Sequence, residues 1–244
     1  MSKGKRADIV LVERGLFESR ARAQAAIAAG HVTADGAPVR KASGTIRPDA
    51  MLSAAPAHPY VSRGALKLVA ALDHFGFDPS GHVCLDIGAS TGGFTEVLLA
   101  RGARRVYAVD VGRGQLHQSL RANAAVVSLE ETDIRTLDPS RLGELPDFVV
   151  IDVSFISLKA VLPAADRLTR RPTQLVALIK PQFEAGRSNV KKGIVRDPAV
   201  HDAVCDEIAA FAASLGWNVE GILPSPIAGG DGNREFLVAA RRTG

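Results

Sequence analysis

The spacing of apolar and polar residues divides the chain into two parts with different patterns. Over residues 1–53 it predicts two short helices, at 7–14 and 19–29, each followed or ended by a glycine that supplies the positive φ of a helix C-terminus. Two short strands, at 32–34 and 37–40, flank an Asp-Gly pair, the strongest two-residue signal for a hairpin turn. A unit this small has room for little core, so we interpret it as a docking domain rather than an enzyme.

A proline-containing segment separates this domain from the rest of the chain. Residues 54–60 include the sequence AAPAHP, in which two prolines stiffen the backbone and prevent regular structure from continuing. We therefore expect a linker at 54–60 between a domain at 1–53 and a second domain at 61–244.

The second domain alternates apolar runs with helical stretches of the length that βαβ crossovers need. Strands are expected at 83–87, 106–110, 147–152 and 175–180, after a first helix at 62–74. A helix at 198–214 and apolar segments at 217–223 and 235–240, around a glycine-rich turn at 229–233, end the pattern. The predicted fold class is α/β. We expect a doubly wound, Rossmann-like sheet, mostly parallel with an antiparallel last strand, behind a small α+β N-terminal domain.

Composition excludes several classes of protein. The chain is 46% apolar, yet no apolar run approaches the roughly 20 residues that span a bilayer, so we expect a cytoplasmic protein without membrane contact. Cys84 and Cys205 lie too far apart in sequence, and from any histidine pair, to predict a disulfide framework or a zinc site. No metal site and no obligate protein partner are indicated.

Positive charge is concentrated at the N-terminus. Residues 1–50 contain nine Lys/Arg and five Asp/Glu, whereas the remainder contains 21 of each, so the first fifth of the chain carries the whole net charge of +4. Such an excess attracts a polyanion such as nucleic acid, but the charge alone is explained equally well by a surface that only keeps the protein in solution.

The sequence VCLDIGASTGGFT at 83–95 predicts a cofactor site. Gly88, Gly92 and Gly93 directly follow the apolar strand, and their missing side chains let a ligand lie against the backbone at the switch point of the sheet. Asp110, which ends the next strand, is placed to accept hydrogen bonds from a ribose diol, of either NAD or S-adenosylmethionine. The dinucleotide pattern would have glycine where Ser90 stands, which favours S-adenosylmethionine. Our full expected set is Asp86, Gly88, Ser90, Thr91, Gly92, Gly93, Phe94, Asp110, Val111, Asp133, Ile134 and Asp152, with Asp133 meeting the adenine amino group.

The absence of two motifs limits which chemical group can accept the methyl group. The segment at the end of the strand 147–152, Asp152-Val153-Ser154-Phe155, lacks the proline pair that amino-group methylation of bases usually requires, and Cys84 lies inside a strand where it cannot act as a nucleophile. A hydroxyl acceptor remains, and a ribose hydroxyl needs a general base or a cationic neighbour. Two lysines and two acids on separate elements are expected to converge at one edge of the sheet for this purpose: Lys67, Asp152, Lys180 and Glu235.

Both domains resemble known families. In the N-terminal domain, the motif R-x-D-x-x-L-x-x-x-G-L-x-x-S-R-x-x-A, followed by I-x-x-G-x-V, resembles the αL RNA-binding domain first described in a small-subunit ribosomal protein. The second domain resembles the FtsJ-like ribose methyltransferases. With VSRGALKL, DIGASTGGFT, DVSFISL, IKPQFE and GIVRDP in this order, the chain resembles the TlyA family of ribosomal RNA 2'-O-methyltransferases, also labelled haemolysins.

The resemblance implies a catalytic pattern, a substrate and an RNA surface. The family's Lys-Asp-Lys-Glu pattern falls on Lys67, Asp152, Lys180 and Glu235, and the substrate implied is a cytidine 2'-hydroxyl in 16S and/or 23S rRNA, free or within ribosomal subunits. Our hypothesis is that the charge of Lys67 favours a neutral Lys180, which acts on the 2'-hydroxyl while the two acids orient the lysines. Basic residues expected to hold RNA are Arg6, Arg20, Arg22, Arg63, Lys191, Lys192 and Arg196.

Two other functions stay open on the sequence alone. One is an NAD(P)-dependent oxidoreductase, which is disfavoured by Ser90 in place of a glycine and by the resemblance of the N-terminal domain to an RNA-binding domain. The other is a non-catalytic RNA-binding factor in ribosome assembly, which the complete set of lysines and acids disfavours.

Overall fold

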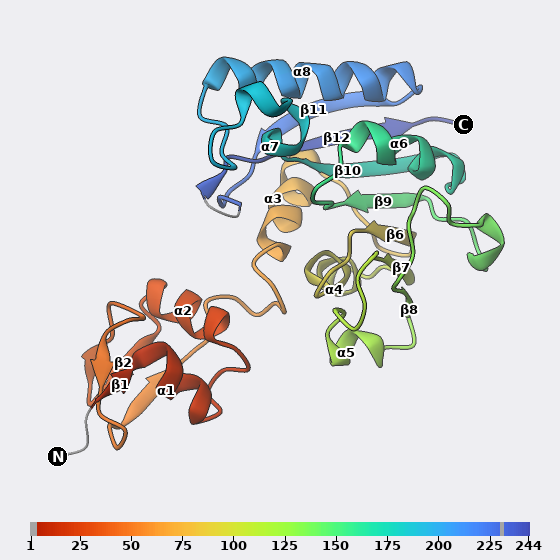
Figure 1. Cartoon of the computed structure of the whole chain (residues 1–244). Coiled ribbons are helices and arrows are strands. Elements are labelled where there is room, and N and C mark those ends of the chain that lie inside the picture. The colour runs from red at the N-terminus through yellow and green to blue at the C-terminus, as the bar shows by residue number, and fades with distance from the viewer. Residues whose placement is uncertain (1–3, 230–231) are drawn as a thin grey trace. The chain divides into compact units, whose positions relative to one another are not determined.

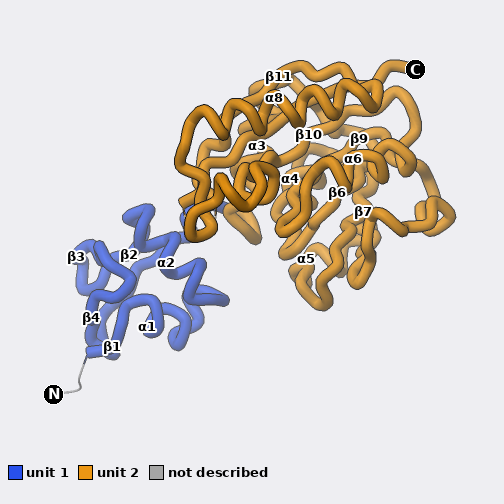
Figure 2. The backbone as a smooth tube through the Cα atoms, turned by 45° about the horizontal axis from the view of Figure 1, so that its top comes forward, with its two compact units in different colours: residues 1–59 blue, residues 60–244 orange. Residues whose placement is uncertain are grey.

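The computed structural model describes residues 4–229 and 232–244, and the chain forms two compact units, residues 1–59 and 60–244 (Figures 1 and 2). The glycine-rich turn predicted at 229–233 includes residues 230 and 231, which lie outside the described residues. Each unit has its own hydrophobic core and is described by itself.

Within its described residues, 4–59, the N-terminal unit contains two helices and five short strands. Its elements are β1 (Lys5–Arg6), α1 (Ala7–Glu13), α2 (Arg20–Ala28), β2 (Val32–Ala34), β3 (Ala37–Pro38), β4 (Thr45–Ile46) and β5 (Leu52–Ala54). The hairpin β2–β3 and both helices are those predicted, and the Ser19 hydroxyl accepts a hydrogen bond from the backbone N–H of Arg22, which caps α2. Strands β1, β4 and β5 were not predicted, because two or three residues are too few to show an alternating pattern.

The end of this unit differs from the expected boundary. Ala54, assigned to the linker by sequence, ends β5 and pairs with Val32, and the N–H of Ala55 donates to the carbonyl of His31. The unit also has a larger core than its length suggested, centred on Leu11, Phe17 and Ile27.

The C-terminal unit is a seven-stranded sheet in the order β11-β12-β10-β9-β6-β7-β8. Its strands are β6 (Val83–Ile87), β7 (Arg105–Val109), β8 (Val126–Leu129), β9 (Phe148–Ile151), β10 (Thr173–Ile179), β11 (Asn218–Pro224) and β12 (Phe236–Arg242). The five strands from β10 to β8 are parallel, while β12 runs antiparallel to both β10 and β11, which confirms the predicted mixed sheet. Strand β8 was not predicted. The chain proceeds outward from β6 to β8 and then returns to β9 on the other side of β6, so the switch point lies between β6 and β9.

Helices cover both faces of the sheet (Figure 1). They are α3 (Ala65–Phe75), α4 (Gly93–Ala100), α5 (Gln118–Arg121), α6 (Leu158–Arg167), α7 (Pro181–Glu184) and α8 (Pro198–Ser214), with single 3₁₀ turns at Pro139–Arg141 and Arg187–Asn189. Buried residues of α3 and α4 form one core with one face of the sheet, and those of α6 and α8 form a second core with the other face. The Asp197 side chain accepts from the N–H of Ala199 and caps α8 where the sequence predicted.

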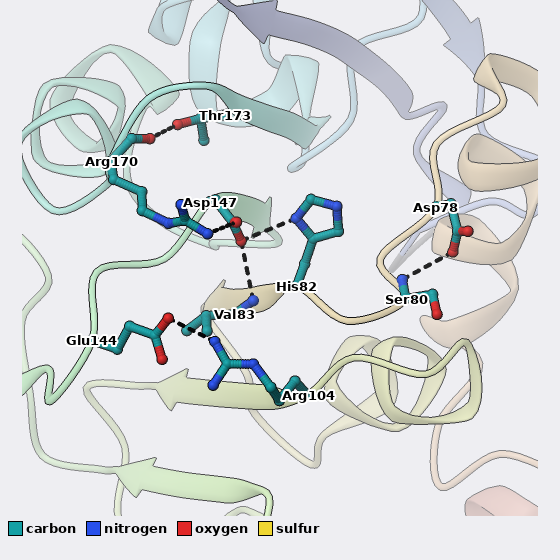
Figure 3. A network of polar contacts seen from close by, with 9 residues as sticks. All are labelled: Asp78, Ser80, His82, Val83, Arg104, Glu144, Asp147, Arg170 and Thr173. Atoms are coloured by element: carbon teal, nitrogen blue, oxygen red, sulfur yellow. Dashed lines mark hydrogen bonds and ion pairs between the residues drawn. The ribbon is translucent and has the colours of Figure 1, made fainter. Parts of the chain in front are cut away.

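A polar network around Asp147 ties the strands together (Figure 3). It lies at the end of the sheet opposite the turn that follows β6 and contains Gly88. The buried Asp147 carboxylate accepts a hydrogen bond of 3.1 Å from the N–H of Val83, contacts His82 Nδ1 at 3.1 Å and pairs with the Arg170 guanidinium. Because these partners precede or begin different strands, Asp147 fixes the relative position of β6 and β9 without reaching the carboxyl ends where ligands bind in this fold.

Candidate active site

The turn between β6 and α4 brings the backbone close to the neighbouring strand. Gly88 has φ +85°, and a Cβ there would lie 2.4 Å from the carbonyl oxygen of Asp152. A Cβ on Gly93 would lie 2.1 Å from the Ser62 hydroxyl, and Ser90 takes a positive φ of 48°. Only glycine fits at 88 and 93 without displacing a neighbour, so the turn packs closely against these neighbours and forms one wall of the site.

A cavity of about 640 Å³ opens at the carboxyl ends of β6, β7 and β9. The residues of the predicted cofactor set that line it are Gly88, Ser90, Asp110, Val111, Asp133, Ile134 and Asp152. The Asp110 carboxylate accepts hydrogen bonds from the N–H of Ser90 at 2.8 Å and of Gly112 at 2.7 Å. These bonds fix the carboxylate at the cavity wall, and each oxygen keeps acceptor capacity for a diol.

Other members of the predicted cofactor set lie elsewhere. Thr91, Gly93 and Phe94 line a second, smaller cavity, and a Cβ on Gly92 would press against Leu120 at 2.2 Å. Asp86 lines neither cavity, because it is fully buried within β6. Asp86 therefore stabilises the fold and does not border either cavity.

Asp86 supports the turn from beneath. One carboxylate oxygen accepts a hydrogen bond of 2.6 Å from the Thr95 hydroxyl of α4, and the other has no hydrogen-bond partner among the residues that the structure describes. The pKa of Asp86 is raised to about 7, chiefly by burial; the hydrogen bond from Thr95 opposes this shift and the charge of the neighbouring Asp152 adds to it. The residue links the strand to the first turn of α4.

Asp133 faces the same cavity but has a partner within the chain. Its carboxylate pairs with the Arg135 guanidinium at 2.6 Å, and that hydrogen bond holds the pKa of Asp133 below its usual range. The proposed contact with an adenine amino group would use the acceptor capacity that Arg135 leaves. Arg135 and Thr132 also line the cavity and were missed by sequence analysis, since neither belongs to a recognisable spacing.

The second cavity, of about 260 Å³, adjoins the first and contains the lysines. Lys180 follows β10 and Asp152 follows β9, and the two form an ion pair of 2.6 Å at adjacent carboxyl ends of the sheet. Lys180 Nζ also donates to the Ser154 hydroxyl at 2.9 Å. Both Lys180 and Asp152 line the cavity, so this pair is open to a ligand that enters it.

A second pair lies on the inner side of this cavity. Lys67 extends from α3 and forms an ion pair of 2.5 Å with Glu235, the residue before β12, and both side chains are more than 90% buried. A lone lysine on a helix is normally solvated, yet here it lines the cavity and is held by a carboxylate 168 positions away. The four residues thus form two lysine–carboxylate pairs. Because Glu235 compensates the charge of Lys67, the contacts do not support the hypothesis that this charge makes Lys180 neutral.

Phe155 is a site residue that the sequence analysis did not select. It lies three positions after Asp152 at the rim of the larger cavity, with a φ of +65° and 90% of its surface exposed. A bulky residue in the left-handed region is strained, and such strain is concentrated at functional sites. The sequence signal that could have identified it is an aromatic residue three positions after Asp152.

Three of the predicted RNA-binding residues form ion pairs within the N-terminal unit, and the other four are exposed residues of the C-terminal unit. Arg6 and Arg20 both pair with Asp8, at 3.0 and 2.9 Å, and these pairs hold the pKa of the buried Asp8 carboxylate well below its usual range. Arg22 pairs with Glu18 at 3.3 Å. Arg63 and the cations of the loop before α8, Lys191, Lys192 and Arg196, are exposed.

Comparison with known families defines the class of protein. Residues 60–242 match the model of the FtsJ-like methyltransferases, and residues 5–52 match that of the S4 domain. The Rossmann-like sheet with its ligand cavity is therefore a methyltransferase domain, and S-adenosylmethionine is its cofactor, as predicted. The oxidoreductase alternative is wrong.

Individual relatives cover nearly the whole chain. The 16S/23S rRNA (cytidine-2'-O)-methyltransferase TlyA of Mycobacterium tuberculosis is 45% identical over 99% of this chain and 91% of its own length. A candidate rRNA methyltransferase of Bacillus subtilis, YqxC, is 46% identical over 97% of this chain and 85% of its own. The solved structure of a candidate hemolysin from Streptococcus thermophilus superposes with a TM-score of 0.79 at 42% identity, covering 100% of this chain and 90% of that one. The chain belongs to the TlyA family of FtsJ-like methyltransferases.

Within residues 4–229 and 232–244, no helix has both the length and the apolar character needed to cross a bilayer.

Proposed function

We propose that this protein transfers a methyl group from S-adenosylmethionine to the 2'-hydroxyl of a cytidine in 16S and/or 23S rRNA. The observation that carries the proposal is the pair of lysine–carboxylate contacts, Lys180 with Asp152 and Lys67 with Glu235, in a cavity that adjoins the cofactor cavity. The name of the M. tuberculosis relative supports the choice of cytidine and of ribosomal RNA. A ribosomal substrate also supports a cytoplasmic location.

The larger cavity suits the cofactor. Asp110 would accept hydrogen bonds from the ribose diol, Asp133 would meet the adenine amino group, and the glycine turn leaves backbone exposed to the rest of the molecule. When bound there, S-adenosylmethionine supplies an electrophilic methyl group on a positively charged sulfur.

The second cavity suits the acceptor. We assign Lys180 to the 2'-hydroxyl, because its ammonium group borders the cavity while Asp152 and Ser154 fix its direction. Proton transfer from Lys180 to Asp152 would leave an amine that accepts the hydroxyl proton as the oxygen attacks the methyl carbon. Lys67, held in place by Glu235, would donate a hydrogen bond to that oxygen as negative charge develops on it.

The proposal assigns RNA-binding residues within each unit separately. Asp8 occupies one edge of Arg6 and of Arg20, whose side chains remain 44% and 54% exposed, so donors on the other edge are available to phosphates. In the catalytic unit, Arg63, Lys191, Lys192 and Arg196 would serve the same purpose. The exposed ring of Phe155 is suited to stack on an unpaired base at the rim.

The proposal is tested by replacing Lys180. We expect Lys180→Ala to lower the rate of transfer of labelled methyl groups to undermethylated rRNA by about 10²–10⁴-fold, the usual contribution of a general base. Binding of S-adenosylmethionine, measured by calorimetry, should stay within about twofold. Lys159→Ala, which removes an exposed lysine paired with Glu207, is the matched control and should retain full activity.

Two results would contradict the proposal. Near-normal transfer by a folded, cofactor-binding Lys180→Ala variant would remove Lys180 from the mechanism. Failure of the unmodified protein to label any rRNA ribose would favour the non-catalytic RNA-binding factor.

A further inference from the structure

A third cavity lies beside the cofactor cavity and has no role in the mechanism above. It measures about 450 Å³ and is lined by residues that include Phe155, Ile156, Gln182, Phe183, Arg187 and Val190. Phe155 and Ile156 also line the cofactor cavity, so the two spaces share a wall. Any ligand in this third cavity would therefore lie next to one that occupies the active site.

The cavity has the chemical character of a site for a planar, aromatic ligand. The rings of Phe155 and Phe183 lie 5.1 Å apart between centroids, tilted by 49°, and Ile156 and Val190 add apolar surface. Phe183 lines this space, and aromatic rings are the stacking surfaces that proteins use for unpaired bases.

A single unsatisfied polar atom adds specificity to this apolar surface. The side-chain oxygen of Gln182 is buried and has no hydrogen-bond partner among the described residues. Leaving a buried acceptor unpaired costs free energy, so the position is suited to a ligand that brings a hydrogen-bond donor. The exocyclic amino groups of cytosine and adenine are such donors.

The cavity has one cation in its lining and others nearby in the sequence. Arg187 lines the cavity, and Lys191 and Lys192 follow in the same exposed loop. An apolar peptide would not need these cations, whereas a nucleotide places a phosphate beside its base.

We propose that this cavity binds the base of a nucleotide adjacent to the methylated one, preferring cytosine or adenine. The base stacks on Phe183, its amino group donates to Gln182, and its phosphate pairs with Arg187. This inference rests on the proposed function, because it requires an RNA in the active site. The cavity selects the sequence context of the target, a task separate from the chemistry at Lys180.

The position of the cavity couples recognition to catalysis. Gln182 and Phe183 belong to α7, which begins directly after Lys180, and the N–H of Phe183 donates to the Lys180 carbonyl at 2.9 Å. A base held by α7 would therefore steady the backbone that carries the catalytic lysine. Phe183 and Gln182 are positioning and specificity residues, since neither touches the reacting atoms.

The test measures steady-state methyl transfer to protein-free rRNA fragments that contain the methylated cytidine, first mapped with the unmodified enzyme. Phe183→Ala and Phe183→Leu should raise KM for RNA by about 5- to 100-fold, as expected when a base loses an aromatic stacking partner. The value of kcat and the affinity for S-adenosylmethionine should change less than about threefold. Phe211→Leu, at a half-buried phenylalanine of α8 outside the three cavities, is the control and should behave as the unmodified enzyme.

Abasic nucleotides then identify the occupant. Removing the base on one side of the target should raise KM of the unmodified enzyme but leave that of Phe183→Ala unchanged, because the variant has already lost this contact. Gln182→Met should reduce the preference for cytosine or adenine over uracil or guanine at that same position.

The outcomes separate this inference from the proposed function. Two results would refute the base-binding site while the proposed function stands, provided that the unmodified enzyme methylates rRNA. One is that Phe183→Ala and Phe183→Leu leave KM unchanged. The other is that removal of the base raises the KM of these variants as much as it raises that of the unmodified enzyme. A loss confined to assembled subunits and absent with protein-free RNA would assign the cavity to a ribosomal protein and also refute it. If the unmodified enzyme methylates no rRNA, both proposals fail.

Discussion

Individual buried charges in this protein have roles that differ with their partners. Asp8 has three donors around it, Arg6, Arg20 and Gln24, which stabilise its ionised form. Asp86 has a single donor, Thr95, and burial therefore dominates and favours its neutral form. The same type of side chain thus anchors cations in the N-terminal unit and supports the cofactor turn in the catalytic unit.

Asp86 predicts a pH dependence of stability. Its pKa of about 7 in the folded state lies above the ordinary value of 3.8, so the folded state binds the proton more tightly than the unfolded state does. The stabilisation is complete below about pH 4 and is lost as the pH rises through 7. Asp86→Asn stays neutral, so its free energy of unfolding relative to the unmodified protein should increase by about 2–3 kcal/mol between pH 5 and pH 8.

The measurement is urea denaturation followed by the fluorescence of Trp217, the only tryptophan in the chain, which is buried in the catalytic unit. Asp73→Asn, at an exposed carboxylate, serves as control. A difference between Asp86→Asn and the unmodified protein that is the same at both pH values would show that Asp86 titrates normally.

At the scale of elements, the turn between β6 and α4 depends on packing more than on its own conformation. Gly88 and Gly76 both have positive φ, +85° and +64°, but only at Gly88 would a Cβ meet another backbone atom. The comparison separates the cost of the dihedral angle from that of the close approach.

We expect Gly76→Ala to cost about 1–2 kcal/mol of stability, the price of a left-handed conformation for an L-residue, with unchanged cofactor binding. Gly88→Ala should cost more and weaken binding of S-adenosylmethionine at least about tenfold, since the turn must move away from Asp152. Thermal denaturation and calorimetric titration measure the two effects. Equal behaviour of the two variants would show that the approach to Asp152 is not a constraint.

At the scale of the whole molecule, charge and chemistry are divided between the two units. The predicted catalytic and cofactor residues lie in residues 60–244, while residues 1–50 carry the whole net positive charge. Each unit has a core of its own, so the division is structural as well as electrostatic.

Removal of residues 1–59 should therefore affect RNA binding and cofactor binding differently. The remaining chain should bind S-adenosylmethionine within about twofold of the full chain. Its affinity for rRNA should fall at least about tenfold, with a shallower dependence of log K on log salt, because fewer phosphates are neutralised. Filter binding at several salt concentrations measures this slope. An unchanged slope would place the RNA contacts in the catalytic unit alone.

Local patterns were sufficient to predict much of the fold. The strands around 83–87 and 175–180, the Asp197 cap of α8 and the hairpin at 32–38 depend on periodicity, capping and turn residues, which act over a few positions. Strands β1, β4 and β5 escaped prediction because they are held by partners distant in sequence rather than by a pattern of their own.

What the sequence by itself determined is the type of each element and the chemistry of the glycine turn, because short-range sterics and hydrogen bonding set them. Only the tertiary structure decided which side chains meet. It paired Lys67 with Glu235 and buried Asp86 beneath the turn. These contacts depend on how helices pack on a sheet, so their distances and burial follow from the assembled fold and not from any local spacing.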